Sequence, residues 1–203
     1  MKVFVWFCLL TFPALASCTT KSGDAKALKT FTSPDGAFRF RYAQLLFRCQ
    51  VGNERTSGAE PENTCAGQQS VCDDDDDSNT ILACFGYPGM RAAFAVAEIP
   101  AANTESVCLR GPEDWPMEVR GIKTIHGVKF KAFEVSTAWT SGGLSGDLYR
   151  TFRLNKCYEL GIRSIRSARN EDETGNKVER TKRQAIELGK RLDEPLKSFR
   201  FLE

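Results

Sequence analysis

The chain has 203 residues, of which 41% are hydrophobic and 27% are charged, the balance of a soluble globular protein with one ordinary domain. This composition excludes an extended disordered chain and a polytopic membrane protein. The 28 Lys and Arg residues against 26 Asp and Glu residues leave a net charge of +2, which gives no reason to expect a nucleic-acid partner. The single histidine leaves little room for histidine-based catalysis or metal binding.

The first 17 residues have the pattern of a signal peptide. Lys2 supplies a basic start, and the apolar stretch that follows it through residue 12 is too short to span a bilayer. The sequence Leu-Ala-Ser-Cys at 15–18 resembles a bacterial lipobox, which predicts cleavage before Cys18 and lipidation of its sulfur. The alternative is cleavage before Ser17, which would release a freely secreted protein.

The number of cysteines favours the lipoprotein. Cleavage before Cys18 with lipidation leaves an even set of six cysteines, suited to disulfides in an oxidising compartment, whereas cleavage before Ser17 leaves seven. Residues 18–27 then form a tether, and the protein is anchored in the bacterial cell envelope. Because Thr19 and not Asp follows the lipidated cysteine, the resemblance to bacterial lipoproteins implies the outer membrane, facing the periplasm or the exterior.

Residues 28–203 are predicted to form a single α+β domain. Strands are expected where apolar and polar residues alternate between turn-forming residues, and the one long helix is expected where apolar residues recur every 3.6 positions. The expected elements, in chain order, are strands on either side of a turn at 33–36, two apolar strands within 81–99, a short helix at 104–109, a hairpin at 118–139 turning at His126-Gly127, a hairpin at 147–166 turning at Asn155-Lys156, a helix at 177–193 ended by Pro195, and a closing strand at 197–201.

A cysteine-rich insertion is expected at 49–84. Residues 50–80 contain too few apolar side chains to form a core, so we expect disulfides to hold this segment. Six cysteines allow 15 pairings. The favoured pairs are Cys49–Cys84, Cys65–Cys72 and Cys108–Cys157. A zinc site is the alternative, although the sequence has no Cys-x₂-Cys pair.

The segment from Phe31 to Tyr42, Phe-Thr-Ser-Pro-Asp-Gly-Ala-Phe-Arg-Phe-Arg-Tyr, resembles the start of PsbP-like domains, the family of the extrinsic lumenal protein of photosystem II. The late helix followed by residues 196–201 resembles the end of these domains. More loosely, Cys157-Tyr-Glu-Leu resembles a strand of certain bacterial envelope lipoproteins. The resemblance implies an antiparallel sheet of about six to seven strands flanked by helices in an α/β/α sandwich, and a non-catalytic accessory or assembly role. It implies no functional residue.

The run of five aspartates at 73–77 is a candidate calcium site. Asp73, Asp75 and Asp77 alternate as at the start of an EF-hand loop, but Ser78 stands where that loop needs glycine, and Cys84 where it needs glutamate. Weak calcium binding is therefore one interpretation, and a solvated acidic loop is the other. No other cofactor is expected.

A glycine-rich segment at 141–146 is predicted to be a flexible loop, since it matches no phosphate-binding motif. With the nearby tryptophans it is the candidate rim of a ligand site, which comprises Trp115, Trp139, Ser141, Gly142 and Gly143. The arginines at 150, 153, 163, 166 and 169 are predicted either to meet an anionic partner or to form a solvated sheet edge.

The sequence favours a lipid-anchored envelope protein that binds an envelope protein or a glycan without catalysis, because no nucleophile–base pair or metal constellation is recognisable. One alternative is an envelope hydrolase without a sequence signature, for which a buried serine beside Glu159 or Asp147 would be the sign. The other is calcium-dependent adhesion through the aspartate run.

Overall fold

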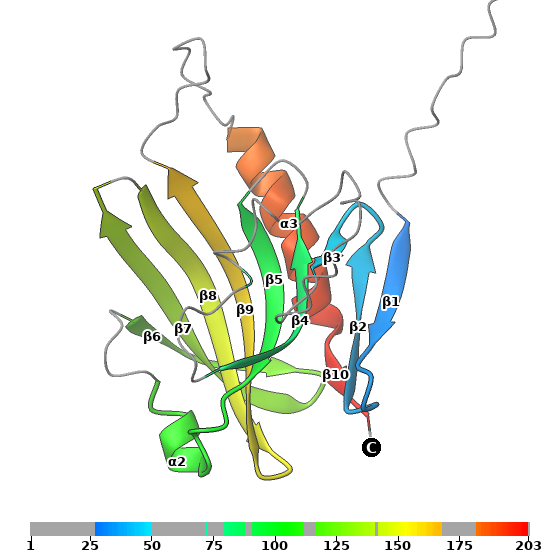
Figure 1. Ribbon diagram of the computed structural model, residues 1–203, viewed down its shortest axis with the longest axis vertical. Coiled ribbons are helices and arrows are strands. Elements are labelled where there is room, and N and C mark those ends of the chain that lie inside the picture. The colour runs from blue at the N-terminus through cyan, green and yellow to red at the C-terminus, as the bar shows by residue number, and fades with distance from the viewer. Residues whose placement is uncertain are drawn as a thin grey trace, which may run out of the picture.

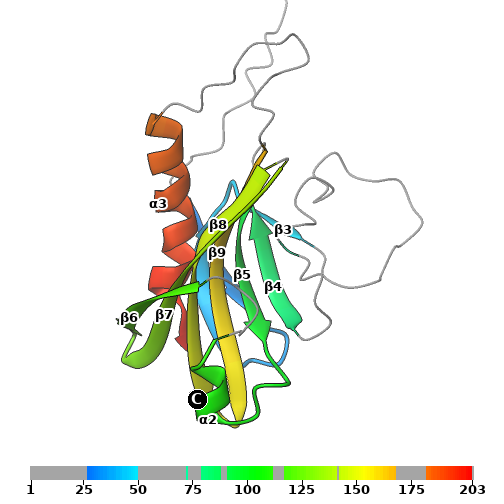
Figure 2. The same cartoon turned by 90° about the vertical axis from the view of Figure 1, so that its left-hand side faces the viewer.

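The computed structural model describes residues 27–49, 72, 79–87, 91–111, 117–140, 142–167 and 182–202. Ten strands and two helices lie within these ranges (Figures 1 and 2). They are β1 (Leu28–Thr32), β2 (Phe38–Ala43), β3 (Phe47–Cys49), β4 (Thr80–Gly86), β5 (Ala92–Glu98), α2 (Glu105–Cys108), β6 (Met117–Ile125), β7 (Val128–Trp139), β8 (Gly142–Arg153), β9 (Lys156–Ser167), α3 (Lys182–Ser198) and β10 (Arg200–Phe201).

The strands form two antiparallel sheets. The large sheet has seven strands in the order β3-β4-β5-β9-β8-β7-β6, and the small sheet has three in the order β1-β2-β10. The predicted α+β class and the antiparallel sheet of six to seven strands are confirmed. The turn predicted at 33–36 joins β1 to β2, and Gly36 adopts the positive φ of 71° that it requires.

The main core lies between the large sheet, the small sheet and α3. Apolar side chains of all three layers are buried together there, among them Phe40 of β2, Phe94 of β5 and Leu196 of α3. The rings of Phe40 and Phe94 meet edge-on at 5.1 Å. Burial of these aromatic side chains is the chief favourable contribution to folding, at about 1.5–3 kcal/mol for each fully buried one.

One end of the opposite face of the large sheet is covered by the segment that follows β5 and contains α2. Thr104 caps this short helix, with its hydroxyl accepting from the amide of Val107. Cys108 at the end of α2 is bonded to Cys157 of β9. Gly111 lies so close to Phe133 that an added Cβ would approach its ring to 3.2 Å. Figure 2 shows α3 along one side of the large sheet and α2 at the lower ends of its strands.

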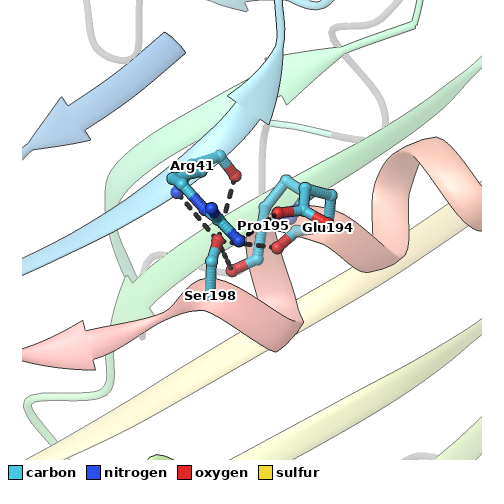
Figure 3. Close-up of polar contacts among 4 residues, drawn as sticks. All are labelled: Arg41, Glu194, Pro195 and Ser198. Carbon is cyan, nitrogen blue, oxygen red and sulfur yellow. Dashed lines mark hydrogen bonds and ion pairs between the residues drawn. The ribbon is translucent and has the colours of Figure 1, made fainter. Parts of the chain in front are cut away.

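Helix α3 continues through Pro195, which corrects the prediction that this proline ends the helix. A proline in the last turn removes one amide donor, and the buried side chains of Leu192 and Leu196 keep this turn against the core. Ser198 then joins the helix end to β2 (Figure 3): its hydroxyl accepts from Arg41 N at 2.8 Å and lies 2.7 Å from the carbonyl oxygen of Glu194. The Arg41 guanidinium forms an ion pair with Glu194 at 2.9 Å.

The turn between β8 and β9 falls at Leu154-Asn155, one residue before the predicted position. Both residues have positive φ, 52° and 60°, as in a type I′ turn. Phe152 therefore lies opposite Cys157 instead of Glu159. The turn at His126-Gly127 is confirmed, with φ values of 44° and 81°.

The glycine-rich segment is part of strand β8 and not a loop, since Gly142–Gly146 pair with both β7 and β9. The reason is a close approach of the backbones. A Cβ on Gly146 would lie 2.2 Å from the carbonyl oxygen of Ile162, and a Cβ on Gly143 would lie 2.7 Å from that of Thr137. Glycine is required here for packing between strands and not for loop flexibility.

Candidate functional site

Three residues of the predicted ligand rim, Trp139, Gly142 and Gly143, lie among the described residues, and the rim itself stays a prediction. Trp139 and Gly142 end and begin neighbouring strands as backbone partners, and Gly143 follows within β8. Trp115 and Ser141 lie outside the described residues. The calcium candidates Asp73, Asp75 and Asp77 also lie outside the described residues, so that site stays a prediction.

Three cysteines meet on one face of the large sheet. Cys72 is bonded to Cys84, with an S–S distance of 2.01 Å, which corrects both predicted pairs Cys49–Cys84 and Cys65–Cys72. Cys49 is also disulfide-bonded, and the sulfur atoms of Cys49, Cys72 and Cys84 all lie within 4.8 Å of one another. All three side chains are buried. Because two of these sulfurs are joined, the trio in this oxidised form does not offer three thiolates to a metal ion.

The second described disulfide, Cys108–Cys157, confirms the prediction for this pair. It joins α2 to β9 across a sequence separation of 49 residues. Ile99, Ala102 and the two cysteines form a small buried cluster at this end of the sheet. The apolar contact between the covering segment and the sheet is small, so the disulfide holds the segment in position.

A buried charge cluster lies on the same face of the sheet as Cys157. Glu159 Oε2 accepts from Arg150 Nε at 2.8 Å, and Glu159 Oε1 accepts from Arg163 Nη2 at 2.7 Å. The three side chains are only 2–8% exposed. Arg150 and Arg163 therefore do not belong to a solvated edge, which corrects that interpretation for these two residues. The alternation of residues along β8 and β9 predicts that all three side chains lie on one face. It does not predict that they are buried.

A second charged group lies on the opposite face, where α3 packs. Glu118, Glu134 and Asp147 occupy directly opposed positions on β6, β7 and β8. Arg120 forms ion pairs with both glutamates. Like charges in opposed positions repel one another, so Arg120 stabilises the three neighbouring carboxylates by offsetting this repulsion. We call Glu118, Arg120, Lys123, Glu134 and Asp147 the β6–β8 polar patch.

The patch borders a buried tyrosine. Lys123 Nζ lies 3.4 Å from the hydroxyl of Tyr149 and 4.7 Å from its ring centroid, a cation–π contact. Burial, with the nearby charges of Asp147 and Asp193, raises the pKa of Tyr149 to about 12. Burial and then the charge of Glu134 raise the pKa of Asp147 above its usual value. The phenol thus stays protonated at neutral pH and can offer a hydrogen bond, but it cannot serve as a base.

No motif in the sequence indicates this patch. Its members come from three strands and are separated by up to 29 positions, and only the strand register brings them together. The available signal for the patch is the set of charged residues at otherwise apolar positions of the two predicted hairpins.

Among the helices of the described part, none has the length and apolar character needed to cross a membrane.

Comparison with known proteins gives likenesses of structure only. No family model matches the chain, and no curated protein matches it. The crystal structure of a Bacteroides thetaiotaomicron protein is similar with a TM-score of 0.47 at 10% identity, over 86% of this chain and 48% of the other, so the chain spans about half of that protein. The solution structure of cyanobacterial PsbP from Synechocystis has a TM-score of 0.44 at 14% identity, over 93% of this chain and 99% of the other.

Proposed function

We propose that the protein is a non-catalytic binding module of the bacterial cell envelope, anchored by lipid on Cys18 and exposed to an oxidising compartment. The lipobox at 15–18 motivates the anchor. The disulfides Cys72–Cys84 and Cys108–Cys157 agree with the compartment, since such bonds are rare in reducing ones. The non-Asp residue after Cys18 favours the outer membrane.

The observation that carries binding over hydrolysis is the environment of Glu159. The hydrolase alternative needs a serine beside Glu159 or Asp147, whereas both oxygens of Glu159 accept from arginines. Both oxygens of this buried carboxylate are thus engaged with cations and not with a serine. No hydrogen bond between a serine and Asp147 is found among the described residues.

We propose the β6–β8 polar patch as the binding surface. Glu118, Arg120 and Glu134 are 69%, 50% and 42% exposed, so these side chains are accessible to a partner. The patch offers carboxylates and two cations on a rigid sheet, which suits the hydroxyl groups of a glycan or the polar surface of an envelope protein.

Anchoring is tested by fractionation of cells that produce the Cys18→Ala variant. We expect the wild-type protein in the membrane fraction and the variant in the soluble fraction or retained with an uncleaved signal peptide. Cys8→Ala, which removes the cysteine of the expected signal peptide, is the matched control and should fractionate as the wild type does. Intact mass of the extracted protein should show lipid on a chain that begins at Cys18. A lipid-free chain that begins at Ser17 would refute the anchor.

Binding at the patch is tested by site-specific photo-crosslinking in intact cells. A photoreactive residue replaces Glu118 in one variant and Leu154, in the β8–β9 turn, in the other; the two side chains are 69% and 70% exposed. We expect a discrete adduct with an envelope component at position 118 and none at position 154. Equal labelling at both positions, or none at 118, would contradict the proposed surface.

A further inference from the structure

Cys49, Cys72 and Cys84 bring two disulfide bonds into contact within one buried cluster. The three sulfurs lie within 4.8 Å of one another, so Cys49 Sγ is close to the Cys72–Cys84 bond while it takes part in another bond. A sulfur of one bond beside a second bond is the arrangement that thiol–disulfide exchange needs. The side chains of Cys49, Cys72 and Cys84 are 2%, 3% and 0% exposed, so the sulfurs are held in place by packing.

The strand register makes a second bond partner for Cys84 available. Cys49 of β3 and Cys84 of β4 are directly opposed residues. Opposed residues of antiparallel strands have Cα atoms about 4.5–5.5 Å apart. A disulfide spans Cα separations of about 4.4–6.8 Å, so a Cys49–Cys84 bond requires no movement of the strands. The Cα atoms of the present partners Cys72 and Cys84 are 5.8 Å apart.

We propose that this trio is a thiol–disulfide exchange site, at which Cys84 transfers its bond from Cys72 to Cys49 when one disulfide is reduced. A dithiol reductant first reduces the bond that holds Cys49: two electrons pass to the protein, the dithiol becomes a cyclic disulfide, and Cys49 and its former partner become thiols. The Cys49 thiolate then attacks Cys84 Sγ. The new Cys49–Cys84 bond forms, the Cys84–Cys72 bond breaks, and its electron pair and the proton go to Cys72 Sγ.

The exchange changes what the bond holds. In the present state Cys84 ties β4 to Cys72, a residue of the predicted insertion. After exchange, the bond joins the two neighbouring strands β3 and β4, and Cys72 carries a thiol. The substrate class of the site is therefore a dithiol, and its product is a thiol at Cys72.

The test uses Cys72→Ser in the full-length protein, produced under oxidising conditions and alkylated before and after reduction. We expect Cys84 to be protected from alkylation and to appear linked to Cys49 in peptide maps, with the free thiol on the former partner of Cys49. The matched control is Cys108→Ser, because no third sulfur of the described residues lies near Cys157. There we expect Cys157 to remain a free thiol.

A free Cys84 in the Cys72→Ser variant, or a bond from Cys84 to a cysteine other than Cys49, would overturn the proposal. A second measurement avoids any folding defect of the variant. The wild-type protein is treated with less than one equivalent of dithiothreitol, alkylated and mapped. We expect peptides with Cys49 linked to Cys84 and with alkylated Cys72. Alkylated Cys49 beside an intact Cys72–Cys84 bond in all reduced molecules would refute the exchange.

Discussion

Arg150 and Glu159 face one another across β8 and β9, with Arg150 Nε 2.8 Å from Glu159 Oε2 and both side chains buried. Arg163, four residues further along β9 and on the same face, donates to the other carboxylate oxygen at 2.7 Å. One carboxylate thus lies between two guanidinium groups inside the protein. Such an arrangement fixes the position of the strands, and it makes the fold sensitive to loss of the carboxylate.

Glu159→Gln should lower the free energy of unfolding by about 3–5 kcal/mol, because it leaves two buried cations beside a neutral amide of the same size. Urea denaturation followed by circular dichroism measures this loss. The midpoint should fall while the dependence on urea concentration stays as in the wild type, since the surface exposed on unfolding does not change.

Glu98→Gln is the matched control for that variant. Glu98 also pairs with a cation of β9, Lys156, at 2.8 Å, but its partner is 45% exposed and Glu98 itself is 21% exposed. An ion pair in contact with water contributes at most about 1 kcal/mol. Similar losses in Glu98→Gln and Glu159→Gln would contradict the role of burial in the cluster.

The Cys108–Cys157 bond should contribute about 2–4 kcal/mol to stability, chiefly by restricting the unfolded chain between its ends. Replacement of both cysteines by alanine removes the bond without leaving a thiol in the small core. Urea unfolding of this double variant should show that loss. Val107→Ala, which truncates a 40% exposed side chain on the same helical turn, should change the stability by less than about 0.5 kcal/mol. A loss below that level in the double variant would refute the stabilising role of the bond.

The face of each strand in the second hairpin could be predicted from sequence although its register could not. The sequence predicts the turn at Asn155-Lys156, one residue later than the structure has it. A shift of the turn by one residue changes the pairing register by two positions. Because side chains alternate with a period of two, this change leaves every side chain on the same face of the sheet. Tyr149 and Leu160 are therefore in the main core as expected.

What could not be predicted depends on contacts between segments distant in sequence. The glycines of β8 indicated a loop, whereas the requirement for Gly146 comes from the carbonyl of Ile162 on the neighbouring strand. Pro195 indicated a helix end, whereas Leu196 continues the buried face beyond it. Cysteine spacing favoured closing the insertion at its two ends, and the bond to Cys72 is set by which sulfurs meet in space.

Gly146→Ala should destabilise the protein, because its Cβ would lie 2.2 Å from the carbonyl oxygen of Ile162 and β8 and β9 would have to separate. Overpacking of this kind costs about 1–3 kcal/mol. Gly189→Ala is the control: nothing lies within 4 Å of its Cβ, and alanine favours the helix by about 0.5–1 kcal/mol. Thermal unfolding should therefore show shifts of opposite sign, and a neutral Gly146→Ala would contradict the close approach.

Asp147 and Asp35 should influence the acid limb of stability in opposite directions. Burial raises the pKa of Asp147 above 3.8, so the folded protein binds more protons than the unfolded chain between the two values. This carboxylate therefore lowers stability as pH rises through that interval. Hydrogen bonds from Ser33 and the Ala37 amide lower the pKa of Asp35, so its contribution is present above 3.8 and is lost as pH falls.

Asp147→Asn should accordingly raise stability at neutral pH and leave it unchanged in acid, where the wild-type carboxyl is already protonated. Asp35→Asn should lower stability at neutral pH, and this loss should shrink as pH falls below 3.8. Urea unfolding of both variants and the wild type from about pH 3 to pH 7 separates the two. The Asp147 residue is largely exposed, so water screens its charge. The change in stability in Asp147→Asn should therefore be smaller than full burial of the carboxylate would give. A loss of stability in Asp147→Asn at neutral pH would mean that the carboxylate is held by its attraction to Lys123, and that the pairing with Lys123 outweighs both burial and the repulsion from Glu134.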